Sequence, residues 1–125
     1  MSAFDKPVTR DVAGRRYFLN GPDASGEGED RNDGFLVFAG ATARIAETGS
    51  LSEPFSRMRS RLVDAGVFIE EGGVYRLTED HLFNSPSTAA MALLSRNANG
   101  RTEWKDAGGV TLKTHQTNEV PGGMS

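Results

Sequence analysis

Hydroxyl groups that could hold an anion are clustered where a helix is predicted to begin. Ser85, Ser87 and Thr88 surround Pro86, directly before an alanine-rich run. Serine is a favoured helix N-cap, and proline is favoured at the first helical position. The free N–H groups and the dipole at such a helix end attract phosphate. The residues therefore predict a capped helix start, and an anion contact at the same place is the functional alternative.

A second group of residues could bind an unpaired base and its phosphate. It contains Arg96, Asn99, Arg101, Trp104 and Lys105. An exposed tryptophan beside basic side chains suits base stacking and phosphate contact. Large aromatic side chains are more often buried, so the alternative is that Trp104 closes the core and the charges are solvated. The hypothesis is that this edge contacts a nucleic acid or an acidic partner.

The residues that could support catalysis are few and poorly spaced. His81 follows Asp80 and precedes Ser85, but a hydrolytic triad also needs a buried orienting acid and an oxyanion hole. The chain has no Gly-x-Ser-x-Gly elbow and no cysteine. His81 and His115 are too far apart in sequence for a zinc site of the usual spacing. We therefore expect no enzyme activity, no metal site and no cofactor.

The negative charge of the chain is concentrated in one segment. The formal net charge is −3, yet the part from Gly34 to His115 contains nine basic and nine acidic residues. Five acidic residues lie in residues 23–33 around a single arginine. A strongly electrostatic nucleic-acid binder is usually basic, so a contact with nucleic acid would have to come from a local basic patch. The Gly26-Glu-Gly28 sequence lies among the acids, whereas a phosphate cradle needs positive charge.

The first part of the chain is predicted to consist mainly of strands. Residues 15–20 form a short strand, and residues 34–39 are apolar on both faces, as in a buried strand. Residues 21–33 contain Pro22, three glycines and the acidic residues, which predicts a mobile loop. Residues 41–46 form either a short strand or a turn.

A helix is predicted between Ser52, a favourable N-cap, and Gly66, which supplies a left-handed C-terminal position. Its apolar stripe, at 3- and 4-residue spacing, comprises Phe55, Met58, Leu62 and Ala65. Arg57 and Arg61 lie on the opposite side. With the following hairpin they could contact DNA as a winged helix does, although a lone basic stripe is usually a solvated face.

The segment 67–78 is predicted to be a β-hairpin, because Gly72-Gly73 permits the positive φ angles of a tight turn. A two-residue loop would pair Phe68 with Leu77. A four-residue loop would instead pair Ile69 with Val74. Both registers remain open from the sequence.

The last part of the chain is predicted to hold a second helix and two strands. The helix begins near Ser85 and stops at residues 97–100, Asn-Ala-Asn-Gly. Residues 101–105 alternate as a strand does, and residues 110–113 return beside them after a turn. We expect flexible tails at residues 1–14 and 115–125.

Residues 15–114 are therefore predicted to form a single compact domain. Its fold class is α+β, with a small, mainly antiparallel sheet and two main helices. The expected core comprises Phe35, Val37, Phe55, Met58, Leu62, Phe68, Leu77, Phe83, Ala90, Leu93, Trp104 and Leu112.

The later half of the chain resembles the bacterial family called domain of unknown function 4357. The family pattern runs Phe-x-Ser-Pro-Ser-x-Ala-Ala, then Asn-Gly, then Trp-Lys, then Gly-x-x-Leu. The matching positions are Phe83, Ser85, Pro86, Ser87, Ala89, Ala90, Asn99, Gly100, Trp104, Lys105, Gly109 and Leu112. The resemblance covers roughly Tyr17 to Lys113. The sequence departs from the pattern at Gly40-Ala41, where a Gly-Ser pair is usual, and in a longer, more acidic segment before Gly34.

This resemblance implies a non-catalytic accessory module. Domains of this family are often attached behind GIY-YIG nuclease-like domains or occur in restriction-modification neighbourhoods, and no catalytic residue transfers from them. We therefore expect a binding module associated with nucleic-acid-processing systems. The alternative is a protein–protein interaction module with no nucleic-acid contact, as a monomer or weak homodimer. Residues 1–7 contain no apolar signal region and no run is long enough to span a membrane, so we expect a cytoplasmic protein without membrane contact.

Overall fold

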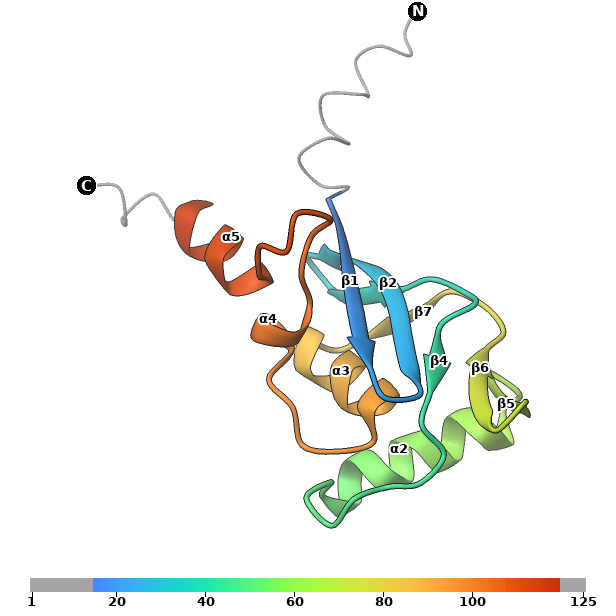
Figure 1. Cartoon of the computed structure of the whole chain (residues 1–125). Helices are drawn as coiled ribbons and strands as arrows, with labels where there is room; N and C mark the ends of the chain where they lie inside the picture. The colour runs from blue at the N-terminus through green and yellow to red at the C-terminus, as the bar shows by residue number, and fades with distance from the viewer. Residues whose placement is uncertain (1–14, 120–125) are drawn as a thin grey trace, which may run out of the picture.

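The computed structural model describes residues 15–119. The expected tail at residues 1–14 lies outside this range, and so do residues 120–125 of the expected tail at residues 115–125. The elements are β1 (Arg16–Gly21), β2 (Ala24–Arg31), β3 (Gly34–Val37), β4 (Thr42–Ala43), α2 (Glu53–Asp64), β5 (Phe68–Glu71), β6 (Val74–Leu77), β7 (His81–Phe83), α3 (Pro86–Leu94), α4 (Gly100–Glu103) and α5 (Leu112–Glu119) (Figure 1). The predicted α+β class is confirmed: one compact domain contains a seven-stranded antiparallel sheet and helices packed on it.

Strand β2 is the centre of the sheet, and the sheet forks beside it. β1 pairs with one edge of β2. On the other edge, β3 pairs with residues 28–31 and β4 pairs with Ser25, so the two strands share that edge. β7 extends the branch that begins with β3, and β6 and β5 extend the branch that begins with β4. Residues 38–41 connect the branches at the fork.

The predicted mobile loop over residues 21–33 is wrong, because most of it is strand β2. Ala24, Gly26 and Gly28 face the helices, as does Asp30, whereas Ser25, Glu27 and Glu29 face away from them. A Cβ atom on Gly26 would lie 2.9 Å from Leu93 Cδ1, and one on Gly28 would lie 2.5 Å from Phe35 Cε2. The glycines therefore allow close packing rather than chain mobility, and a two-residue alternation of small and acidic residues was the overlooked signal.

The register defines an inner and an outer face of the sheet. Residues directly opposite each other in antiparallel strands share a face, so Leu19, Phe35 and Phe83 belong to the buried inner face. Phe18, Ser25, Glu27, Leu36 and Leu82 share the outer face. In the hairpin of β5 and β6, Phe68 pairs with Leu77, so the two-residue loop is the register adopted. For residues 41–46, where a short strand or a turn was expected, the structure has the two-residue strand β4.

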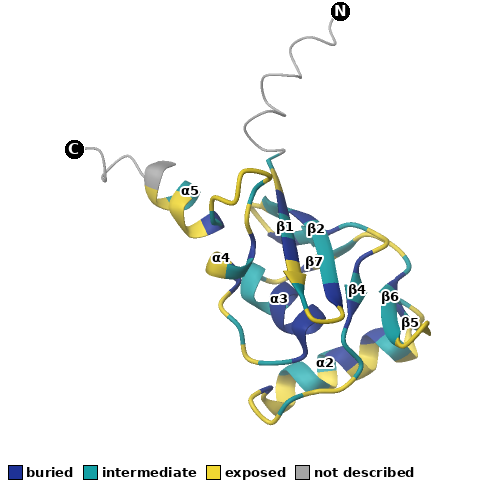
Figure 2. Cartoon of the chain, viewed as in Figure 1, coloured by how far each residue is buried: buried dark blue, intermediate teal, exposed yellow. Residues whose placement is uncertain are grey.

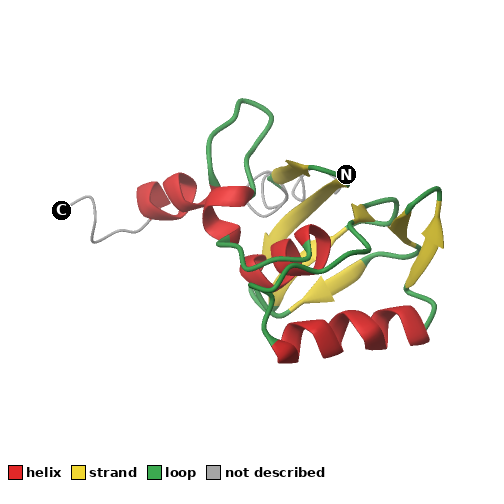
Figure 3. Cartoon of the chain, turned by 60° about the horizontal axis from the view of Figure 1, so that its bottom comes forward, coloured by secondary structure: helices red, strands yellow, loops and turns green. Residues whose placement is uncertain are grey.

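The helices pack on the inner face of the sheet (Figures 1 and 3). α3 contacts β2, β3, β4 and β7, and its residues 89–94 are all buried (Figure 2). α5 reaches the same face, since Gln116 Nε2 donates to Asp30 Oδ2 at 3.2 Å and the ring of His115 lies 6.0 Å from that of Tyr17. Among the described residues, the outer face carries no helix.

The predicted strand pair at residues 101–105 and 110–113 is wrong. α3 ends at Leu94 with Ser95 in the left-handed conformation, so residues 97–100 do not stop it. Gly100 instead begins the short helix α4, capped by the Asn99 side chain. Of the expected pairing, the single bridge between Lys105 and Thr111 is present, and Lys105 also forms a bridge with Phe18 of β1.

The folded part also continues past the predicted boundary at residue 114. The Thr111 hydroxyl accepts from Thr114 N at 3.2 Å and so caps the start of α5. α5 then runs to Glu119, which includes residues assigned to the tail from the sequence.

The core contains most of the expected residues. Phe35 and Trp104 are in contact at its centre, with ring centroids 4.5 Å apart and planes tilted by 38°, and both are fully buried. Met58 is half-buried and packs against the core, whereas the half-buried Phe55 does not belong to it, which corrects the assignment of Phe55. The buried residues of α2 are instead Arg59 and Leu62. Within residues 15–119, no helix is long and apolar enough to cross a membrane.

Candidate functional site

The hydroxyl cluster at the start of α3 is engaged in capping. Ser85 Oγ accepts from Thr88 N at 3.1 Å and lies 3.0 Å from Thr88 Oγ1. Ser87 Oγ accepts from the backbone N–H of Gly100 at 2.9 Å. The predicted helix start is therefore present, and its hydroxyls already have partners within the chain.

The beginning of α4 covers this helix end. A Cβ atom on Gly100 would lie 2.1 Å from the carbonyl carbon of Pro86 and 2.4 Å from Ser87 N, so only glycine fits there. Trp104 is fully buried, and its Nε1 donates to the Pro86 carbonyl oxygen at 3.0 Å. The core alternative for Trp104 is thus the one that the structure adopts, and its ring has no free face for a base.

The polar residues of the Arg96–Lys105 segment separate into two groups. Asn99 Oδ1 accepts from Arg101 N at 3.0 Å as the cap of α4. Arg96 lies 3.5 Å from a Glu103 carboxylate oxygen, and Arg101 Nε donates to Gln116 Oε1 at 2.7 Å. These three residues belong to the helical side of the molecule.

Lys105 is placed differently, on the sheet. Its backbone N donates to Phe18 O at 3.0 Å, and Phe18 N donates to Lys105 O. This antiparallel bridge puts the Lys105 and Phe18 side chains on the same face, the outer one. Lys105 is exposed, and no ion pair within the described part of the chain involves it.

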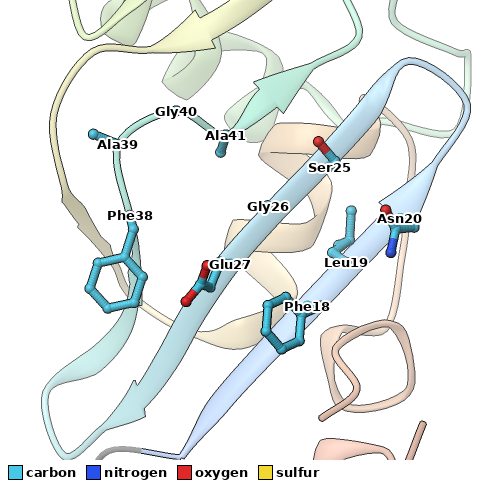
Figure 4. Close-up of a pocket in the computed structure, with 10 residues that line it drawn as sticks. All are labelled: Phe18, Leu19, Asn20, Ser25, Gly26, Glu27, Phe38, Ala39, Gly40 and Ala41. Atoms are coloured by element: carbon cyan, nitrogen blue, oxygen red, sulfur yellow. The ribbon is translucent and has the colours of Figure 1, made fainter. Parts of the chain in front are cut away.

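The outer face is hollowed at the fork of the sheet (Figure 4). The hollow has a volume of about 320 Å³. It is lined by Phe18, Leu19, Asn20, Ser25, Gly26, Glu27, Phe38, Ala39, Gly40 and Ala41. Figure 4 shows the rings of Phe18 and Phe38 on either side of β2, with Glu27 between them.

The walls of the hollow are held by the backbone. Phe38 N donates to Glu27 O at 2.9 Å, and Gly40 N donates to Leu77 O at 2.8 Å. Ala39 N donates to Asp80 Oδ1 at 2.8 Å. Residues 38–41 are therefore fixed on both sides of the fork, and the hollow is preformed.

Charges on the outer face largely compensate one another. Arg16 bonds to Glu27 and lies 3.5 Å from Glu29, and Arg31 lies 3.4 Å from the same Glu29. The Arg16 guanidinium also lies 4.2 Å from the centre of the Phe38 ring, a cation–π geometry. Arg16 and Arg31 thereby neutralise Glu27 and Glu29, the acidic residues of β2 that lie on this face.

The residues considered for hydrolysis are not assembled into a catalytic group. His81 packs edge-on against Phe83, with ring centroids 4.6 Å apart. Burial lowers the pKa of His81 below its ordinary value, partly offset by nearby Glu79. Asp80 accepts from Ala39 N, and Ser85 is the cap of α3. No described hydrogen bond joins His81 to either residue.

Two other polar groups stabilise the fold: the buried Arg59 with its partners, and the His115–Asp106 pair. Arg59, 2% exposed, donates to Ala92 O at 3.0 Å, to Glu47 Oε2 at 2.7 Å and to Arg44 O. His115 Nε2 lies 2.7 Å from Asp106 Oδ2, and this hydrogen bond, followed by that from Val110 N, lowers the pKa of Asp106. Residues 15–119 contain no cluster of three side chains suited to a metal ion.

Sequence reasoning missed both the outer-face aromatics and the buried Arg59. Phe18 alternates with the buried Tyr17 and Leu19, so its outward position could have been inferred from the strand period. Arg59 is three residues before Leu62, on the apolar stripe of the helix, which could have indicated burial. Phe38 follows the last residue of β3, and only the fork places it beside the hollow.

The comparisons with known proteins identify the family of the chain but not a ligand. A family model described as "Domain of unknown function (DUF4357)" matches residues 17–116. Neither a curated protein nor a solved structure matches the chain significantly.

Proposed function

Since the chain belongs to the DUF4357 family, whose function is unknown, we propose that it is a non-catalytic binding module of nucleic-acid-processing systems. The observation that carries the proposal is the preformed hollow on the outer face, between Phe18 and Phe38. Its 320 Å³ lie at the small end of the roughly 300–1,000 Å³ that ligand pockets occupy. The surface suits recognition of a ligand that spreads over several strands.

The distribution of side chains between the two faces supports this assignment. Large aromatic residues on an antiparallel sheet are expected to pack into the core. Phe18 and Phe38 are instead partly exposed on the face that the described helices leave open, with the polar side chains of Asn20, Ser25 and Glu27 beside them. An exposed apolar patch that is rimmed by polar side chains marks a binding site.

The association with nuclease-like domains that the resemblance implies favours nucleic acid as the ligand. Lys105 lies on the outer face next to Phe18, so a cation for phosphate is present beside the aromatic surface. Helical-side arginines are less suitable, because Arg96 has a carboxylate partner and Arg101 is held by Gln116.

A protein partner is the second candidate, and one observation favours it. Arg16 and Arg31 are paired with Glu27 and Glu29, so the face has little net charge. A neutral, partly apolar surface fits a protein contact better than a duplex, whose binding rests on phosphate neutralisation.

An amide NMR titration at low salt tests the proposal. Short single-stranded DNA, duplex DNA and RNA are added separately to the chain. We expect saturable shifts at Phe18, Ser25, Phe38 and Lys105 that weaken as salt rises, since phosphate contacts release counterions. The double variant Arg96→Glu, Arg101→Glu is the control for the helical side and should bind as the unchanged chain does. No shift with any nucleic acid would direct the search to a protein partner.

A further inference from the structure

Building on the proposed function, we infer that the hollow at the fork takes one unpaired base of a single-stranded nucleic acid. The base stacks on the Phe18 ring and contacts the part of the Phe38 ring that Arg16 leaves uncovered, and Lys105 contacts the adjacent phosphate. The ligand is thus a single-stranded nucleic acid, and Phe18, Phe38 and Lys105 hold it.

The register provides the spacing that such binding requires. Lys105, Phe18 and Glu27 are successive members of one cross-strand row on the outer face, and Phe38 N bonds to Glu27 O. Opposite side chains in antiparallel strands have Cβ atoms about 4.5–5.5 Å apart. An aromatic ring with a cation one strand away therefore lies within reach of a single nucleotide, base and phosphate together.

The shape of the surface favours a single strand over a duplex. Bases in a duplex are stacked on each other, so the flat rings of a sheet surface can reach only bases that have been unstacked. The hollow is shallow and open, and its backbone walls are already fixed, so no rearrangement has to precede stacking.

The polar lining can bond the edge of a base. The Asn20 amide both donates and accepts, the Ser25 hydroxyl can still accept although it lies 3.1 Å from Thr42 Oγ1, and the Glu27 carboxylate can accept from an amino group beside its bond with Arg16. Glu27 repels phosphate, but Arg16 offsets its charge from the side of Phe38. Lys105 then supplies the positive charge for phosphate on the other side of Phe18.

Fluorescence anisotropy with a labelled single-stranded DNA of about eight nucleotides measures the effect, since such surfaces cover roughly 4–16 nucleotides. Phe18→Leu keeps an apolar side chain without a ring, whereas Phe18→Tyr keeps the ring. We expect Phe18→Leu and Phe38→Leu to weaken binding about tenfold or more, and Phe18→Tyr to retain it. Leu82→Ala, on the same face outside the hollow, is the matched control and should leave the affinity unchanged.

The salt dependence tests the role of Lys105 separately. Each phosphate contact of a single strand contributes a slope of about −0.7 to log affinity against log salt, so Lys105→Gln should reduce the slope by about 0.7. Amide spectra of each variant establish that it is folded.

The outcomes distinguish this inference from the proposed function. If single strands bind but Phe18→Leu has no effect, or if the duplex binds as tightly, the base-stacking site is wrong while nucleic-acid binding stands. If no nucleic acid binds and a protein occupies the outer face, both are wrong. Loss of single-strand binding in the two leucine variants, with retention in Phe18→Tyr and Leu82→Ala, supports both.

Discussion

The indole Nε1 of Trp104 donates to the carbonyl oxygen of Pro86 at 3.0 Å, across 18 residues of sequence. This bond joins the tryptophan of the family pattern to its Ser-Pro-Ser segment. Gly100 lies against the same Pro86 and Ser87 backbone. The most recognisable residues of the chain therefore form one structural joint around the start of α3. Lys105, the next residue of the pattern, is the one whose side chain is directed to the open face.

Substitution of Gly100 tests how tight this joint is. Gly100→Ala should destabilise the domain by about 1–3 kcal/mol or more, because the new Cβ would lie 2.1 Å from the Pro86 carbonyl carbon and backbone must move. Gly49→Ala is the control, since nothing lies within 4 Å of a Cβ atom there. Urea unfolding of both variants gives the difference. Equal stability of the two would contradict the close packing.

Removal of the buried guanidinium should be far more costly than removal of an exposed one. Arg59→Met removes three hydrogen bonds: Ala92 O loses its bond from the guanidinium, whereas Arg44 O and Glu47 keep only those from Ser95 and Ser56. An unsatisfied buried group costs about 1–3 kcal/mol. Arg57→Met removes only an exposed pair with Glu53, which is worth about 0.2–0.5 kcal/mol. Thermal unfolding should rank the two variants in that order.

The half-buried ring of His81 should make the domain less stable in mild acid. Its folded pKa is lowered from 6.5 by burial, so the unfolded chain binds a proton more readily. Stability is therefore highest above about pH 6.5 and falls as the pH decreases towards the folded pKa. His81→Gln should flatten the dependence below about pH 6.5. A curve of the same slope in this variant would assign the dependence to another group.

The Asp106 carboxylate should contribute stability that is lost at lower pH. The hydrogen bond with His115, and then that from Val110 N, lowers its folded pKa below 3.8. The contribution is present above that value and disappears as the pH falls through the folded pKa. Asp106→Asn keeps an oxygen for Gly108 N and Val110 N but removes the charge, so unfolding should depend less on pH below about pH 4. An unchanged acid dependence would contradict this role.

Local sequence signals were sufficient for several elements. The α3 helix starts where Ser85 and Pro86 predicted, and the tight turn at Gly72-Gly73 is present. The same type of reasoning did not predict that residues 24–31 form the central strand, because glycines and acids are typical of loops. They form a strand because α3 packs against their inner face and β1 pairs with one edge, and both contacts exist only in the folded chain.

The sequence by itself determined the fold class, the two main helices and the family, since caps, turn glycines and apolar periods act over a few neighbouring residues. The tertiary structure decided which side chains face the core and which face outwards. It buried Trp104 and Arg59, neutralised Glu27 and Glu29 of β2 with Arg16 and Arg31, and brought Phe18, Phe38 and Lys105 to one face. Those outcomes depend on strand register and on packing between distant segments, and neither is specified by any short stretch of chain.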